Sequence, residues 1–468
     1  MPGRALALDG GPGGRDGRPG GSLAGWTGAT ALPPLHSRML RDSPSDPASG
    51  PSPSTPAGAP ALAPPGAGRA ALVFIFITVT IDLLAFGIII PVLPHLVREL
   101  AGGSLPEASR WNGVFGTAFA LTQFISSPIQ GALSDRYGRR VVILISCLGL
   151  GLDFAVMALA ASIPVLLAGR IVSGITAASF STANAYIADV TPPERRAAAF
   201  GMLGAAFGIG FVVGPALGSL LSSLDVRAPF WGAAALALCN FLYGLLVLPE
   251  SLPPERRSPR FDWSRANPLG ALLALRRYPQ VVGLALVAFL FNVAHYVLPS
   301  TFVLYADARY GWGPSMVGWV MAASGACGAV VQAGLAGRVV ARLGERRTLL
   351  LAAAFGALGF AWYGLAPSGG WFLAGVPVLA LWGLGSPAVQ SLMSRQVDPR
   401  EQGRLQGAVT GLTSAAGIFA PFVFASLFAA AVEPGARLAL PGVGFLLAAG
   451  LVAAGGLAGA RATRPRHA

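Results

Sequence analysis

The chain has 468 residues, of which 54% are hydrophobic and only 11% are charged. A soluble domain carries about 25% charged residues, so this composition excludes an ordinary soluble globular protein. Several apolar stretches reach the roughly 20 residues that an α-helix needs to cross a bilayer. The composition therefore predicts an all-α polytopic membrane protein with the lipid bilayer as its surroundings.

The first 68 residues differ in composition from the rest. They are rich in Gly, Pro, Ala and Ser, as in "PSPSTPAGAPALAPPGAG". Such a segment buries too little apolar surface to order itself, so we expect a disordered tail over residues 1–68. It has no apolar run behind a basic flank and therefore does not resemble a secretory signal.

Hydropathy then predicts twelve membrane-spanning helices in chain order. The predicted spans are 71–97, 111–133, 141–161, 163–188, 197–222, 228–249, 281–305, 314–341, 346–367, 371–394, 403–431 and 439–460.

The basic residues follow the predicted topology. The net charge is +13 and every one of the 33 cationic residues is arginine. With the N-terminus placed in the cytoplasm, 22 arginines fall at inner ends or inner loops and five at outer ones. This bias is typical of the positive-inside rule. It predicts a cell-membrane protein with both termini in the cytoplasm, and we expect no nucleic-acid partner.

The sequence repeats itself after 206 residues. The stretch "GALSDRYGRR" (131–140) falls on "GRVVARLGER" (337–346), and Pro215 falls on Pro421. Parallel repeats of this kind are typical of transporters with a central site. We predict two six-helix halves, 69–249 and 281–460, a cytoplasmic linker over 250–280 and a C-terminal tail over 461–468.

The charged stretch at 131–140 must contain a tight turn between two spans. Gly131 precedes the turn, and Gly138 suits a position with positive φ. The cations that hold the turn on the cytoplasmic side are Arg136, Arg139 and Arg140. Asp135 is not required by topology, and the second copy has Ala341 in its place. We interpret Asp135 as part of a gate; the alternative is a solvated loop that only sets orientation.

Two acids and one arginine lie deep inside predicted spans, well away from the span ends: Asp82, Asp153 and Arg170. Charges at this depth are costly and usually mark ion or substrate paths. A buried carboxyl group can exchange a proton near neutral pH, whereas arginine stays charged. We therefore predict proton coupling through these residues, with Arg170 neutralising Asp153. The alternative is a buried structural ion pair.

The fifth predicted span contains "GIGFVVGPALG". Its small residues Gly210, Gly214 and Gly218 allow close helix packing, and Pro215 bends the helix.

These motifs resemble a known family. The stretch "GALSDRYGRR" resembles the loop between helices 2 and 3 of the major facilitator superfamily, which acts there as a gate between the halves. The span-five stretch resembles that family's antiporter motif. "RIVSGITAASFSTANAYIADVTPPERRAAAFG" and "SPAVQSLMSRQVDPREQGRLQG" resemble the tetracycline-efflux branch of its drug:proton antiporters. The resemblance runs from the first span to the last.

The resemblance implies a monomeric transporter of twelve helices in two six-helix halves. It implies export of a small amphipathic compound, such as a drug, by alternating access, with the proton as coupling ion and no metal or other cofactor. Asp82, Asp153 and Arg170 match the intramembrane acids and arginine of that branch, which supports the proton-coupling assignment. Such a protein would confer antibiotic resistance.

The C-terminal half departs from the branch. Gly356 and Gly328 stand where members of the branch carry an aspartate and a histidine, so tetracycline does not follow as the substrate. Polar and aromatic residues that remain as candidates for a substrate cavity are His295, Asn292, Tyr296, Gln332, Trp382 and Gln390. His295 is alternatively a packed core residue.

Two other functions remain open at this point. One is a proton-coupled importer of a small metabolite, and the other is a non-transporting receptor on the same fold. The sequence contains no phosphate-binding loop, metal-ligand cluster or nucleophile elbow, so we expect no enzyme activity.

Overall fold

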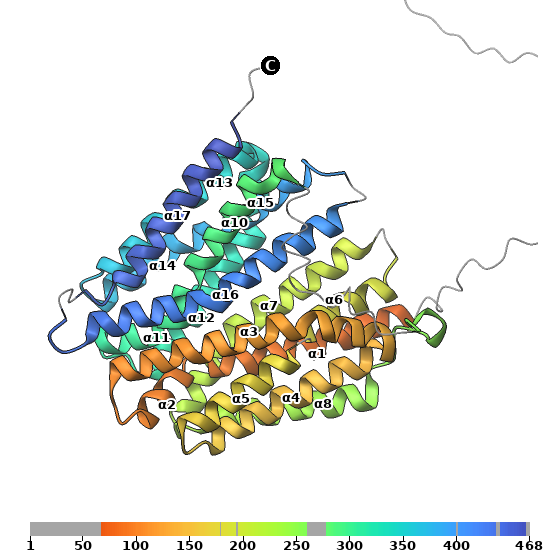
Figure 1. Ribbon diagram of the computed structural model, residues 1–468, viewed down its shortest axis with the longest axis horizontal. Helices are drawn as coiled ribbons and strands as arrows, with labels where there is room; N and C mark the ends of the chain where they lie inside the picture. Colours follow the sequence, from red (N-terminus) through yellow and green to blue (C-terminus); the bar gives the residue numbers. More distant parts are fainter. Residues whose placement is uncertain are drawn as a thin grey trace, which may run out of the picture. The chain divides into compact units, whose positions relative to one another are not determined.

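The computed structural model describes residues 67–177, 179–192, 195–259, 278–398, 401–436 and 440–464. The predicted tail lies outside the described residues except for its last two, and so do 260–277 of the predicted linker and 465–468 of the C-terminal tail. Every element of regular structure in the described ranges is a helix (Figure 1).

The helices of the first half are α1 (Ala67–Ile89), α2 (Leu93–Leu100), α3 (Leu105–Tyr137), α4 (Arg139–Leu159), α5 (Ile163–Thr176), α6 (Ser179–Val190), α7 (Arg196–Ser222) and α8 (Ala228–Val247). A short 3₁₀ turn, η2 (Pro254–Arg256), follows them.

The helices of the second half are η4 (Pro279–Val281), α10 (Val282–His295), α11 (Val297–Tyr310), α12 (Pro314–Val330), the π-helical turn η5 (Val331–Leu335), α13 (Ala336–Leu365), α14 (Gly369–Ala380), η6 (Leu381–Leu384), α15 (Gly385–Ser394), α16 (Gln402–Val432) and α17 (Val443–Ala462).

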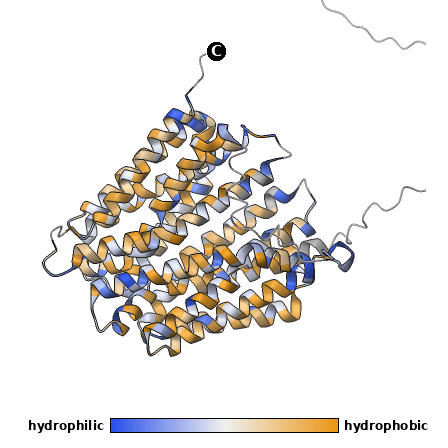
Figure 2. Ribbon diagram, in the orientation of Figure 1, coloured by the Kyte–Doolittle hydropathy of each residue, from blue (hydrophilic) through white to orange (hydrophobic). Residues whose placement is uncertain are grey.

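The predicted twelve membrane crossings are recovered from these helices. Within the described residues, ten helical segments are long and apolar enough to cross a membrane. The segment Pro314–Leu365 counts once among them, although Gly344 breaks it with φ of +75°. Helix α3 is not among the ten, and it carries polar side chains such as Asn112 and Gln123 along its length. Dividing the long segment and adding α3 gives twelve. Figure 2 shows apolar residues along the helices and polar ones gathered towards helix ends.

Five predicted spans are broken rather than continuous. The first changes from α1 to α2 across residues 90–92, the fourth from α5 to α6 at Ala177, and the seventh from α10 to α11 at Tyr296. The eighth passes through η5 and the tenth through η6. Irregular backbone inside a membrane is tolerated where it is buried in protein or lines a cavity. Both Ala177 and Tyr296 line the central cavity described below.

The internal repeat recurs as a pair of equivalent contacts between the halves. Ser109 of α3 donates its hydroxyl to the Ala425 carbonyl of α16 at 2.7 Å. Ser219 of α7 donates to the Ser315 carbonyl of α12 at 2.6 Å. A shift of 206 residues carries Ser109 onto Ser315 and Ser219 onto Ala425. The α3–α16 and α7–α12 contacts are therefore two copies of one arrangement.

The turns of the repeat also match. Gly138 ends α3 with φ of +105°, and its counterpart Gly344 has φ of +75°. The predicted positive φ at Gly138 is confirmed, because only glycine adopts this region without strain.

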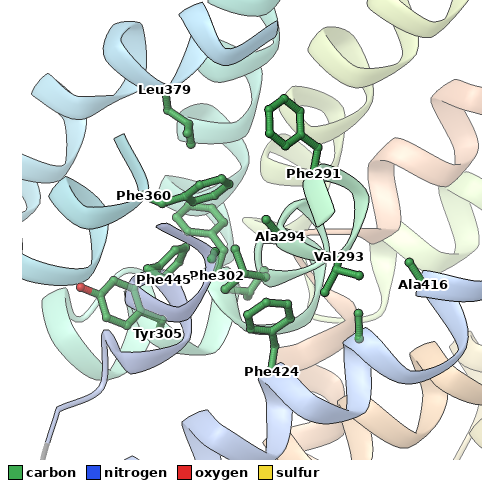
Figure 3. Packing of buried hydrophobic residues seen from close by; sticks show 14 of the residues in the cluster. Phe291, Val293, Ala294, Phe302, Tyr305, Phe360, Leu379, Ala416, Phe424 and Phe445 are labelled. Carbon is green, nitrogen blue, oxygen red and sulfur yellow. The ribbon is translucent and has the colours of Figure 1, made fainter. Parts of the chain in front are cut away.

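An aromatic cluster forms much of the core of the second half (Figure 3). Tyr305 of α11 packs edge-on against Phe445 of α17, with ring centroids 4.9 Å apart. Its hydroxyl donates to the Tyr363 carbonyl of α13 at 2.8 Å. Such aromatic pairs add about 0.5–1.5 kcal/mol beyond the area they bury, so this cluster ties α11 firmly to α13 and α17.

In the first half, α1 and α7 approach so closely that their backbones touch. A Cβ atom added at Gly214 would lie 2.7 Å from the Cα of Gly87, and one added at Gly210 would lie 2.5 Å from the Cβ of Leu83. The neighbouring Pro215 carbonyl faces α12, because a Cβ at Gly318 would lie 2.5 Å from it. The glycine and proline motif therefore joins α7 both to α1 and to the other half.

This packing makes Gly214→Val a destabilising substitution. The added methyl groups would meet backbone atoms of α1, which cannot rotate away, and overpacking of this kind costs about 1–3 kcal/mol. We expect a lower unfolding temperature for the detergent-solubilised protein. The matched control is Gly208→Val on the same helix, since nothing lies within 4 Å of a Cβ at Gly208. Equal unfolding temperatures for the two variants would contradict the packing described here.

Candidate functional site

A cavity of about 730 Å³ lies between the two halves. Most of its wall is apolar and aromatic, with contributions from Phe86, Phe119, Phe207 and Phe211. Polar residues from the first half include Asp82, Asn112, Gln123, Arg170 and Ser179, and those from the second half include Asn292, His295, Tyr296 and Ser324. An apolar wall with a few polar groups is typical of a site for a small amphipathic molecule.

The two halves are joined at one end of the cavity, which we call the Arg98 end. Arg98 of α2 forms an ion pair with Asp307 of α11. Arg110 Nη2 lies 3.2 Å from a carboxylate oxygen of Glu433, and Asn112 Nδ2 donates to the Ser300 carbonyl at 2.8 Å. These contacts seal the cavity at this end. The sequence interpretation missed them because charge at an outer loop does not reveal its partner.

At the opposite end, which we call the Arg139 end, α7 and α12 diverge. Near the Arg98 end, Gly318 and Gly325 of α12 lie against the α7 backbone; a Cβ at Gly325 would be 3.0 Å from the Phe211 carbonyl. Further along, nothing lies within 4 Å of a Cβ at Gly328 on α12 or at Gly204 on α7. The contact between the halves is therefore lost along this helix pair toward the Arg139 end.

Asp82 of α1 lines the cavity and is held from behind by a second helix. Its side chain is buried, and its Oδ1 accepts a hydrogen bond of 2.8 Å from Asn240 Nδ2 of α8. Its Oδ2 lies 3.7 Å from the Cys147 sulfur of α4. Asn240 was not identified from the sequence, although an amide in the middle of the apolar stretch "ALCNFLYG" was a signal for it.

The predicted pairing of Asp153 with Arg170 is present. Arg170 Nη2 forms an ion pair with Asp153 Oδ2, and the Asp153 side chain is fully buried. Gly169 makes room for it, because a Cβ there would lie 2.8 Å from Asp153 Oδ1. Arg170 lines the cavity and stands 5.6 Å from the ring centroid of Phe119, whereas Asp153 is not in the lining. The Arg170 guanidinium therefore faces the cavity, and its counter-ion Asp153 lies behind it, outside the cavity wall.

Arg139 is the centre of a charged network at the turn between α3 and α4. Its Nη1 lies 2.5 Å from Asp135 Oδ1, and its Nε lies 3.1 Å from Asp189 Oδ2 at the end of α6. Its backbone N–H donates to Glu250 Oε1 at 2.8 Å, just beyond α8. A side chain at Gly138 would collide with the same Glu250 carboxylate. The turn is thereby tied to α6 and α8 of its own half.

The other residues of the predicted gate lie around this network. Arg140 donates to the Leu245 carbonyl of α8, and the guanidinium of Arg136 lies 5.2 Å from the Tyr137 ring centroid. Nothing lies within 4 Å of a Cβ at Gly131. In this arrangement Asp135 pairs with Arg139 of its own half.

The second copy of the turn carries the same contact with its charges inverted. Glu345 forms an ion pair with Arg395 and accepts a hydrogen bond of 3.2 Å from the Ser391 hydroxyl. A shift of 206 residues carries Arg139 onto Glu345 and Asp189 onto Arg395. The Arg139–Asp189 pair of the first half therefore has an oppositely charged counterpart in the second.

Three of the six candidate cavity residues in the second half line the cavity: Asn292, His295 and Tyr296. The structure does not place the other three there, because each is engaged elsewhere. Gln332 donates to the Gly383 carbonyl at 3.1 Å, and Gln390 donates to Gln406 at 3.2 Å. Trp382 packs edge-on against Phe360 and Phe291, with centroids 5.1 and 5.7 Å away.

Trp382 also explains one departure from the tetracycline-efflux pattern. A Cβ at Gly356 would lie 2.6 Å from Trp382 Cδ1. The indole therefore occupies the space that an aspartate at position 356 would need. His295 lies near the same indole, with ring centroids 6.0 Å apart and the planes tilted by 37°, but its side chain is exposed and lines the cavity instead of packing in the core.

Comparison with known proteins gives a consistent result. The sequence pattern of the Major Facilitator Superfamily matches residues 75–421. The tetracycline resistance protein, class C, of Escherichia coli is 38% identical over 363 residues, covering 78% of this chain and 91% of that protein. The class G protein of Vibrio anguillarum is 36% identical over 373 residues, covering 77% and 91%. The crystal structure of the human organic anion transporter MFSD10 (TETRAN) is 25% identical with a TM-score of 0.64, covering 85% of this chain and 100% of that one.

A titratable group lies beside the seal at the Arg98 end. His95 Nδ1 lies 4.0 Å from Asp307 Oδ2, the same oxygen that pairs with Arg98. Burial lowers the pKa of His95 below its ordinary value of 6.5; the attraction of Asp307 opposes this shift, and the repulsion of Arg98 reinforces it. The sealed arrangement therefore favours the neutral imidazole.

We predict that acid weakens this seal. The pKa of His95 is lowered in the sealed arrangement, so the neutral imidazole is the form that this arrangement favours. The stability that His95 gives to the sealed arrangement is therefore complete above about pH 6.5, and it declines as the pH falls through the lowered pKa. Spin labels at Glu99→Cys and Gly370→Cys, with Cys239 and Cys327 replaced by serine, should report a longer distance at acid pH. His95→Gln should remove the pH dependence. Identical distance distributions at all pH values in the parent protein would contradict the prediction.

Proposed function

Because the chain belongs to the major facilitator superfamily, we propose that it is a secondary active transporter that exports a small amphipathic compound in exchange for protons. The observation that carries the proposal is the position of Asp82. This carboxyl group lies in the membrane interior and in the wall of the central cavity. There it can be reached by both a proton and a substrate.

The cavity favours a drug-like substrate with a broad apolar surface. Its wall combines aromatic side chains with a few hydrogen-bonding groups and the Arg170 cation. Relatives that are 36–38% identical are tetracycline resistance proteins, which supports drug export. The space at Gly356 is occupied by Trp382, so the substrate contacts of the second half differ from those of the tetracycline-efflux pattern.

The chain is a multi-pass membrane protein, and we infer its orientation from its arginines. Arg136, Arg139, Arg140, Arg256 and Arg257 all lie at the Arg139 end. By the positive-inside rule this end is cytoplasmic, and both termini lie on the same side. The arrangement described here, sealed at the Arg98 end, is then the inward-facing state. The cavity is built from one chain, which supports a monomer.

The proposed cycle follows from these positions. In the inward-facing state the substrate enters from the cytoplasm, and the halves then separate at the Arg98 end and meet at the Arg139 end. A proton taken up by Asp82 from the outside neutralises its carboxylate and favours return of the empty cavity to the inside. Arg170 keeps its charge throughout, because arginine does not deprotonate; its partner Asp153 stabilises that charge.

The proposal can be tested by a susceptibility panel. The protein expressed in a pump-deficient bacterial host should raise resistance several-fold to at least one class of amphipathic drug, with tetracyclines tested beside other classes. The Asp82→Asn variant, expressed to the same level, should give no protection. Unchanged susceptibility to every class, or greater sensitivity of the kind an importer causes, would contradict export.

Proton coupling has its own test. In everted membrane vesicles with an imposed pH gradient, Asp82→Asn should abolish gradient-driven accumulation of an exported drug, because the only change is loss of a protonatable group in the cavity wall. The matched control is Asp225→Asn, an acid in the loop between α7 and α8 that accepts a hydrogen bond from the Arg227 backbone at 2.7 Å. Normal pumping by Asp82→Asn would show that another residue carries the proton.

A further inference from the structure

Asn240 is completely buried in the middle of α8 and donates both of its amide hydrogens to α1. Nδ2 lies 2.9 Å from the Thr78 carbonyl and 2.8 Å from Asp82 Oδ1. Its Oδ1 has no hydrogen-bond partner among the described residues. The opposite amide orientation would place that oxygen against two acceptors, the Thr78 carbonyl and the Asp82 carboxylate. The chemistry of the site therefore fixes Asn240 as a donor to the ionised form of Asp82.

Each oxygen of Asp82 accepts from a neighbouring helix. Oδ1 accepts from the Asn240 amide, and Oδ2 accepts a longer hydrogen bond of 3.7 Å from the Cys147 thiol of α4. The Ser179 hydroxyl, in the cavity wall, also hydrogen-bonds this carboxylate. Asn240 is not part of the cavity wall, but Asp82 is. A proton that arrives through the cavity converts the carboxylate to a neutral carboxylic acid. The hydrogen bond from Asn240 then loses its charge assistance and weakens.

Helix α8 carries this contact toward the Arg139 network. Leu245, whose carbonyl accepts from Arg140, follows Asn240 by five residues, which is about 7.5 Å along a helix. Glu250, which accepts from the Arg139 backbone, comes just beyond the end of the same helix. One rigid element thus contacts both the proposed proton site and the turn at the Arg139 end.

We propose that Asn240 is the positioning residue for Asp82: it holds the carboxylate oxygen Oδ1 by donating to it, and it thereby sets the pH at which Asp82 exchanges its proton. This rests on the proposed function in one respect, the assignment of Asp82 as the proton-carrying group. Asn240 itself does not touch the substrate. It acts through Asp82 and through its place on α8.

The test is an infrared pH titration of the full-length protein reconstituted in lipid. The carboxylic-acid C=O band that is absent from Asp82→Asn reports the protonated form of Asp82. In Asn240→Leu, which keeps the volume but removes the donor, we expect the titration midpoint to move to higher pH by about one unit, the scale of one charge-assisted hydrogen bond. The C=O band should also shift in frequency, because Oδ1 has lost its donor.

Two further variants make the test specific. Asn240→Ser, which is smaller and keeps a hydroxyl donor, should give a smaller shift, and it serves if Asn240→Leu does not fold. Gln332→Leu should leave the Asp82 midpoint unchanged, because Gln332 donates to the Gly383 carbonyl within the second half and does not line the cavity. A merely structural role for Asn240 would alter stability without moving the midpoint.

The outcomes separate the two proposals. If the Asp82 band titrates in the parent protein and the midpoint is unchanged in both Asn240 variants, the positioning role is wrong while the proton role of Asp82 stands. If no band that Asp82→Asn removes titrates in the parent protein, both assignments fail. If the midpoint moves as expected but the vesicles show no gradient-driven transport, export is wrong and the positioning role stands.

Discussion

The high free energy of a charge in hydrocarbon governs the arrangement of this protein. Within the described spans, the deeply buried ionised side chains each have a partner on a neighbouring helix. Arg170 pairs with Asp153, and Asp82 accepts from Asn240. These contacts connect α1 to α8 and α4 to α5, so the same groups that serve chemistry at the cavity also determine which helices pack together.

The same constraint concentrates the remaining charge at the helix ends, where it joins elements. At the Arg98 end the charges connect the two halves through Asp307 and Glu433. At the Arg139 end the charges described here connect helices within one half, as Arg139 does with Asp189. The uneven distribution of these ion pairs matches the divergence of α7 and α12 along their length. The ion pairs described between the halves therefore lie at the end where the halves meet.

Much of the fold could be predicted from the sequence, because hydropathy and repeat spacing are local or periodic signals. They indicated twelve crossings, the positive φ at Gly138 and the burial of Asp153 beside Arg170. The direction in which each side chain points was harder to predict. Gln332 and Gln390 looked like cavity residues by polarity, yet each bonds within its own half. Asn240 was missed since a single amide in an apolar helix has no partner that spacing alone can identify.

The inverted pair in the second half has a consequence for how alike the halves can be. The Arg139–Asp189 and Glu345–Arg395 pairs are each neutral, so inverting one changes nothing within its own half. Between the halves the difference is large. Two identical halves would both carry arginine at this position of the turn, whereas here Arg139 has Glu345 as its counterpart. The halves are therefore similar in backbone but opposite in charge at this pair, a difference that a chain assembled from two first halves would lose.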